Sequence, residues 1–122
     1  MAENITKDNE LVQPIKILDK EGNLKYLLDF NRASVKYAEM RGFKLDNMEG
    51  LSMSAMEDLF HYSFRAHQPK MTKAETDKIL YDELHGFKEG MIERLVELYL
   101  QPFNTLMQAE DTAKNSTMTV EF

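Results

Sequence analysis

Three histidines are the residues best suited to bind a metal ion, but their spacing does not bring them together. His61 and His67 are six positions apart, so on a helix they lie on different faces, and His85 belongs to a later element. Asp58 precedes His61 by three positions and could share a turn with it, yet two side chains supply too few ligands for a metal ion. We therefore expect no metal site, and we expect solvated or capping roles for the histidines.

The residue pattern also carries no sign of catalysis. The acidic pairs Glu57-Asp58 and Asp82-Glu83 fall on the polar sides of predicted helices, whereas paired carboxylates do acid–base chemistry only where a cleft separates their pKa values. The chain has no cysteine, its serines form no nucleophile elbow, and its five glycines stand singly rather than in a phosphate-binding loop. We expect a protein that is not an enzyme and binds no cofactor.

Methionine is the unusual residue, with nine in 122 positions. It is flexible and polarizable, and it is frequent on surfaces that repack around varied partners. The predicted last helix also carries two parallel apolar stripes, which is wider than one packed face requires. The same spacing fits a methionine-filled core or self-association, and these alternatives stay open. The residues that we expect to contact a partner are, first, Leu95, Leu98, Tyr99, Phe103 and Leu106 and, second, Met53, Met56 and Phe60.

The charge pattern excludes two classes of partner. Acidic residues number 21 against 15 Lys and Arg, for a net charge of −6, and acids outnumber bases near both ends. Nucleic-acid binding needs a clustered basic stripe, and docking on an anionic membrane needs basic residues too. An apolar run long enough to cross a membrane and a secretory leader are both missing from the sequence, so we expect a cytoplasmic protein.

The apolar stripes belong to one predicted domain over residues 12–108. A flexible arm over residues 1–11 precedes it, and a flexible acidic and polar tail over residues 109–122 follows it. Residues 12–18 and 24–30 alternate around a glycine-containing turn and predict a β-hairpin. Four helices are expected after it, so the fold class is α+β, with the hairpin packed on a mostly helical body. Residues 118–122 alternate as well and could add as a strand to another element.

Capping residues and prolines predict where the helices begin and end. Asn31 is a good N-cap, and Gly42 is expected to end that helix, with Phe43 folding back as its hydrophobic contact. The next helix begins near Ser52 or Ser54, where Ser54 and Glu57 have capping-box spacing, and Pro69 ends it. A second capping box, Thr72 with Glu75, opens the third helix, and Gly86 closes it. The fourth helix covers roughly residues 88–108 and is expected to kink or break before Pro102.

The order of these features resembles a known family. Leu28-Asp29-Phe30-Asn31-Arg32 leads into a helix that closes with Glu39-Met40-Arg41-Gly42-Phe43. Next come the run Leu59-Phe60-His61-Tyr62-Ser63-Phe64-Arg65-Ala66-His67-Gln68-Pro69 and the predicted helix over residues 72–84. The last features are Leu95-Val96-Glu97-Leu98-Tyr99 and a short polar tail. Over residues 12–108 the chain resembles the small tail assembly chaperones of long-tailed (siphovirus-type) bacteriophages and prophages of Gram-positive bacteria.

This resemblance implies a non-catalytic chaperone that binds the tape measure protein, a long, apolar, helical protein. The chaperone keeps that partner soluble in the host cytoplasm during tail morphogenesis and leaves before the virion is complete. The tail tube protein and a second copy of the chain are further candidate partners. Two alternatives stand beside this function: a structural or adaptor component that stays in the phage particle, and a small regulatory protein that dimerises through its last helix.

Overall fold

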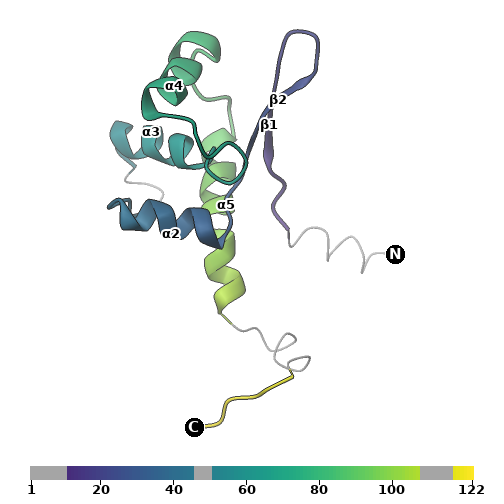
Figure 1. Ribbon diagram of the computed structural model, residues 1–122, viewed down its shortest axis with the longest axis vertical. Helices are drawn as coiled ribbons and strands as arrows, with labels where there is room; N and C mark the ends of the chain where they lie inside the picture. Colours follow the sequence, from purple (N-terminus) through teal and green to yellow (C-terminus); the bar gives the residue numbers. More distant parts are fainter. Residues whose placement is uncertain (1–10, 46–50, 108–116) are drawn as a thin grey trace.

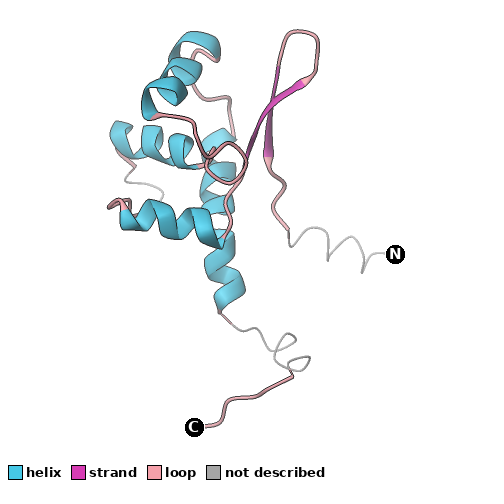
Figure 2. Cartoon of the chain, viewed as in Figure 1, coloured by secondary structure: helices cyan, strands magenta, loops and turns pink. Residues whose placement is uncertain are grey.

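The computed structural model describes residues 11–45, 51–107 and 117–122, and it has an α+β fold (Figures 1 and 2). An N-terminal hairpin comes first, and a mostly helical body follows, as the sequence predicts. Residues 1–10 of the predicted arm over residues 1–11, and residues 109–116 of the predicted tail over residues 109–122, lie outside the described residues. The elements in chain order are β1 (Ile15–Leu18), β2 (Leu24–Leu28), α2 (Arg32–Met40), α3 (Met53–Tyr62), α4 (Lys73–Lys78), the π-helical turn η1 (Ile79–Glu83) and α5 (Met91–Leu106).

The hairpin is a two-stranded antiparallel sheet with an irregularity between Ile17 and Leu18. Its turn is held by the Asp19 carboxylate, whose Oδ1 accepts hydrogen bonds from the backbone N–H groups of Glu21 and Asn23, both at 2.9 Å. Gly22 has a φ of 89°, a conformation that glycine adopts without a Cβ clash. The turn residues thus fix the predicted hairpin.

Both predicted ends of α2 are confirmed. The Asn31 side chain accepts from the Ser34 N–H at 2.8 Å, while the Ser34 hydroxyl accepts from the Asn31 N–H at 2.9 Å, which forms a reciprocal capping box. At the other end, the Phe43 N–H donates to the Ala38 carbonyl across Gly42, so the helix closes in a Schellman motif. The cap turns Phe43 into the core, where it is buried.

Helix α3 begins at one of its two predicted positions and ends earlier than predicted. Ser52 is the N-cap, because its side chain accepts from the Ala55 N–H at 3.1 Å, so the capping box of Ser54 and Glu57 does not open this helix. The helix ends at Tyr62 rather than at Pro69, and residues 63–67 form turns. The reason is tertiary: the Ser63 carbonyl accepts from the Asp29 N–H at 2.9 Å, which requires the chain to leave the helix beside β2.

The predicted capping box of Thr72 and Glu75 does open α4. After Lys78 the helix widens into η1, and the Gly86 N–H, donating to the Leu80 carbonyl at 2.9 Å, closes this segment as expected. The last helix, α5, begins after Gly90 and continues through Pro102 to Leu106, so the predicted break is wrong, and the kink stays a prediction. Tyr99 before the proline and Phe103 after it pack ring against ring, with centroids 5.7 Å apart, which holds the two halves of the helix together.

The core forms around α5, which contacts α2 and α3 and also holds the segment before β1 (Figure 1). The Val12 N–H donates to Gln101 Oε1, and Arg94 Nη1 donates to the Gln13 carbonyl, both at 3.2 Å. Within the described ranges, no helix is long and apolar enough to cross a membrane. The buried core residues are Leu28, Phe30, Val35, Ala38, Phe43, Leu59, Phe60, Phe64, Ile79, Leu80, Leu95, Val96, Leu98 and Tyr99.

Candidate binding surfaces

Four of the eight residues that we expected to contact a partner are core residues. Phe60, Leu95, Leu98 and Tyr99 are each at most 2% exposed, so the expectation that they face a partner is wrong for this conformation. The physical reason is the central place of α5. Helices α2 and α3 pack on this helix and the segment before β1 is bonded to it, so Leu95, Leu98 and Tyr99 of its double stripe are buried inside the domain.

Tyr99 shows how closely this part of α5 is packed. Its ring lies edge-on against Phe30 and Phe43, with centroids 5.1 and 5.4 Å apart, and tilted against Phe103. Burial, with a smaller contribution from the nearby Glu39 charge, raises the pKa of the Tyr99 hydroxyl to about 12. Tyr99 therefore stabilises the domain and has no free face to offer to a partner.

The other four predicted residues reach solvent, but on different elements. Met53 at the start of α3 and Leu106 at the end of α5 are largely exposed, whereas Met56 and Phe103 are half-buried. The structure thus keeps Phe103 and Leu106 on one surface and leaves Met53 and Met56 on another helix.

The C-terminal half of α5 forms an exposed apolar surface. Its members are Leu100, Phe103, Leu106 and Met107, which we call the α5 end surface; Leu106 is 75% and Met107 is 73% exposed. Leu100 and Phe103 have the i, i+3 spacing of one helix face, and Met107 is the C-cap residue that follows α5. Leu100 and Met107 were missing from both predicted sets, and Leu100 falls on neither of the two stripes that the periodicity predicts.

Two open hollows flank the α5 end surface. One has a volume of about 720 Å³ and lies between residues 11–14 and the last turns of α5, with Gln101, Pro102 and Leu106 in its wall. The other has about 360 Å³ and lies between Phe103 and the chain after α2, including Phe43 and Leu45. An exposed apolar ridge between two hollows is suited to contact an apolar helix.

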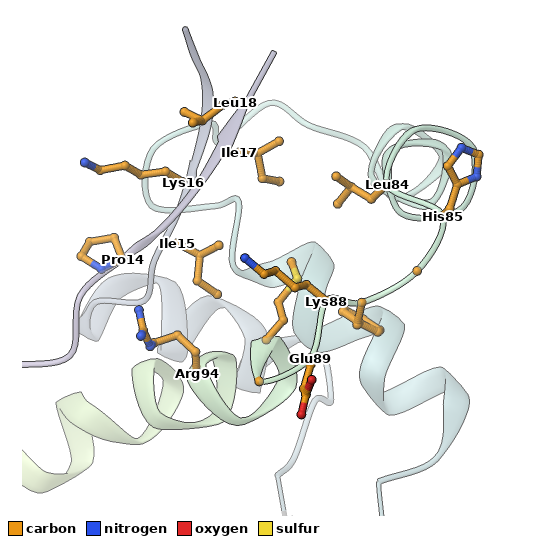
Figure 3. A pocket seen from close by; sticks show the side chains of 14 residues that line it. Pro14, Ile15, Lys16, Ile17, Leu18, Leu84, His85, Lys88, Glu89 and Arg94 are labelled. Atoms are coloured by element: carbon orange, nitrogen blue, oxygen red, sulfur yellow. The ribbon is translucent and has the colours of Figure 1, made fainter. Parts of the chain in front are cut away.

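A third hollow, which the sequence pattern does not predict, runs along β1 (Figure 3). This β1 groove, of about 660 Å³, lies between residues 14–18 on one side and residues 84–91 with Arg94 on the other. Its basic side chains are Lys16, Lys88 and Arg94, with Glu89 as an acidic neighbour. The two walls lie far apart in the chain, so a local sequence motif could not predict the groove.

The densest charged cluster joins α3 to α4. Lys73 Nζ lies 3.7 Å from both Glu57 and Asp58 and 3.2 Å from Asp77. Burial opposes the charge of Lys73, but its hydrogen bond to Asp77 and the surrounding carboxylates outweigh that cost, so the pKa of the lysine is raised. A lysine held protonated in this way is a structural cation rather than a nucleophile.

His61 and Glu57, two of the residues considered above for chemistry, contact side chains of the following helical segment. His61 Nδ1 lies 3.0 Å from the Thr76 hydroxyl, and burial together with the Lys73 charge lowers the pKa of His61. Glu57 accepts a hydrogen bond from the Tyr81 hydroxyl. Over residues 11–45, 51–107 and 117–122, no group of three or more metal-ligating side chains is arranged to hold a metal ion.

These observations define a small α+β domain with an exposed apolar surface at the end of α5 and three open hollows. The chain belongs to the family described as "Domain of unknown function (DUF5055)", whose model matches residues 1–122. Comparison with curated proteins and with solved structures gave no match.

Proposed function

We propose that this protein is a non-catalytic tail assembly chaperone that binds the tape measure protein of a long-tailed phage and keeps it soluble in the host cytoplasm. The observation that carries the proposal is the α5 end surface, an exposed apolar ridge flanked by two hollows. The resemblance of residues 12–108 to such chaperones supplies the identity of the partner.

The chemistry of the surface agrees with this role. A chaperone that coats an apolar helix needs accessible apolar area and a charged exterior that keeps it in solution. The α5 end surface offers the area, and the net charge of −6 offers the charged exterior. The charged cluster around Lys73 is used to join helices, which favours a binding protein over an enzyme.

Co-expression with the long helical protein encoded just downstream tests the proposal. We expect that protein to be insoluble when expressed alone and to co-elute with this chain in a pull-down. The double variant Leu106→Asp with Met107→Asp should abolish co-elution, because it places two charges on the exposed ridge. The matched control, Leu24→Asp with Met40→Asp, changes two exposed apolar side chains on β2 and α2, away from the α5 end surface, and should co-elute like the wild type.

A partner that stays insoluble in the presence of the wild-type chain contradicts the proposal. Equal loss of binding in both double variants contradicts the assignment of the surface. Mass spectrometry of purified particles separates the alternative, because a structural or adaptor component stays in the virion, whereas a chaperone of this kind leaves before completion.

A further inference from the structure

The two edges of the hairpin differ in how their backbone groups are satisfied. On β2, the Leu27 N–H and C=O both bond to the Gln68 side-chain amide, so they point away from β1. Lys16 stands opposite Leu27, and an opposed pair in an antiparallel ladder exchanges both hydrogen bonds or neither. The Lys16 N–H and C=O therefore point outward from β1, where the described part of the chain provides no backbone partner.

The β1 groove lies along this open edge. Figure 3 shows Ile15 and Ile17 pointing into the groove toward Leu84, while Lys16 points the opposite way. An extended segment beside β1 would thus find outward-facing backbone groups at Lys16, an apolar floor on one face and a basic side chain on the other. Pro14 has no N–H, so the ladder ends there and only a short strand fits.

Residues 118–122 have the matching pattern. Met118, Val120 and Phe122 alternate with Thr119 and Glu121, and all three apolar side chains are highly exposed. The segment lies beyond the C-terminal end of α5, whereas Met91 and Arg94 in the groove belong to the N-terminal end of the same helix (Figure 1). Each copy therefore presents the segment and the groove at different places on its surface.

We propose that residues 118–122 of one copy add as a strand to the open edge of β1 in a second copy. The added strand runs antiparallel to β1, so Glu121 stands opposite Lys16 and exchanges both backbone hydrogen bonds with it, and their side chains form a cross-strand ion pair. Val120 and Phe122 flank this pair and lie beside Ile17 and Ile15. Lys88 and Arg94 give the groove a positive character that suits an acidic segment.

The geometry also predicts how the association behaves. The donor segment and the acceptor groove are different surfaces, so the contact is head-to-tail, and each copy can donate to one neighbour while it accepts from another. A five-residue strand buries much less than a standard interface of about 1,600 Å². The association is therefore weak and grows with protein concentration.

Disulfide trapping tests the pairing directly, because the wild-type chain has no cysteine. One preparation carries Lys16→Cys and the other carries Glu121→Cys, and the two are mixed under mild oxidation. We expect about tenfold more mixed dimer than in a control mixture in which Lys25→Cys replaces Lys16→Cys, since pairing raises the effective concentration only at β1. Lys25 is equally exposed but lies on β2, one strand further from the added segment.

Two outcomes of the trapping experiment overturn the proposal. Equal yields from Lys16→Cys and Lys25→Cys mean that the segment collides with the surface without pairing. A chain carrying both Lys16→Cys and Glu121→Cys that closes on itself in preference to forming dimers means that the segment occupies its own groove.

Charge reversal provides an independent readout in sedimentation across a roughly hundredfold range of concentration. Lys16→Glu alone and Glu121→Lys alone should each weaken the association, and a mixture of the two variants should restore it. Val120→Asp with Phe122→Asp should abolish it, while Thr119→Ser should leave it unchanged. Because these side chains are exposed, the variants keep the fold, and unaltered association in Val120→Asp with Phe122→Asp contradicts the proposal.

Discussion

Gln68 pairs with Leu27 as if its side chain were the next strand of the sheet. The amide oxygen accepts from the Leu27 N–H at 2.9 Å, and the amide nitrogen donates to the Leu27 carbonyl at 3.1 Å. A residue from the turns after α3 thus closes the outer edge of β2 and joins the hairpin to the helical body. The same contact orients β1, because it fixes which backbone groups of the hairpin face outward.

Replacing Gln68 by methionine should therefore destabilise the whole domain. The substitution keeps the length of the side chain but removes both hydrogen bonds to Leu27, which we expect to cost about 1–3 kcal/mol of unfolding free energy. Urea denaturation followed by circular dichroism measures this loss. Gln13→Met is the matched control, since the Gln13 side chain is exposed and should change stability little. Equal stability of the two variants would show that the Gln68 contact is not formed.

The start of α3 can be tested with a pair of serine substitutions. Ser52→Ala removes the side chain that accepts from the Ala55 N–H, and we expect it to cost about 1 kcal/mol. Ser54→Ala lies two residues further on, inside the first turn, and should cost almost nothing or stabilise the helix slightly. Thermal melts of both variants decide between the two N-caps; a larger loss in Ser54→Ala would place the helix start at Ser54.

Two leucines of α5 should respond oppositely to the same substitution. Leu98 is 1% exposed, so Leu98→Asp buries a charge without a partner and should unfold a domain of ordinary stability. Leu106→Asp places its charge in solvent and should leave the melting curve close to that of the wild type. Circular dichroism melts check this contrast. A folded Leu98→Asp variant would mean that the inner half of α5 is accessible after all.

The buried hydroxyl of Tyr99 predicts how stability falls at alkaline pH. Its pKa is raised to about 12 in the folded chain from 10.0, so the neutral form is favoured by the fold. The unfolded chain loses this proton more readily, so the stabilisation from neutral Tyr99 is complete below about pH 10 and declines as the pH rises from about 10 toward 12. In a comparison of unfolding free energies, Tyr99→Phe should show a smaller decline than the wild type over this window. Equal declines would mean that Tyr99 ionises as freely in the folded chain as in the unfolded one.

Local signals in the sequence predicted most of the secondary structure. The capping box of Asn31 with Ser34, the Schellman motif at Gly42 and the box of Thr72 with Glu75 are formed by residues within one or two turns of each other. Such contacts depend on neighbouring residues alone, and for that reason the hairpin and the helices could be located before the structure was known. Helix α3 departs from the prediction where a distant partner intervenes, at Ser63 beside Asp29.

The binding surfaces could not be predicted in the same way. Periodicity showed that α5 is apolar on a wide face, but Leu95 and Leu106 look alike in the sequence, and one is buried while the other is exposed. The difference arises because the body covers the first turns of the helix and not the last ones. The β1 groove depends on tertiary structure even more, since its walls come from opposite halves of the chain.

By itself, therefore, the sequence determined the α+β class, the order of the elements and most of their caps, because each depends on local propensity and patterning. Only the tertiary structure decided which apolar side chains form the core and which remain free to bind. Burial depends on how distant segments pack, so a stripe of leucines does not by itself predict which of its members are covered.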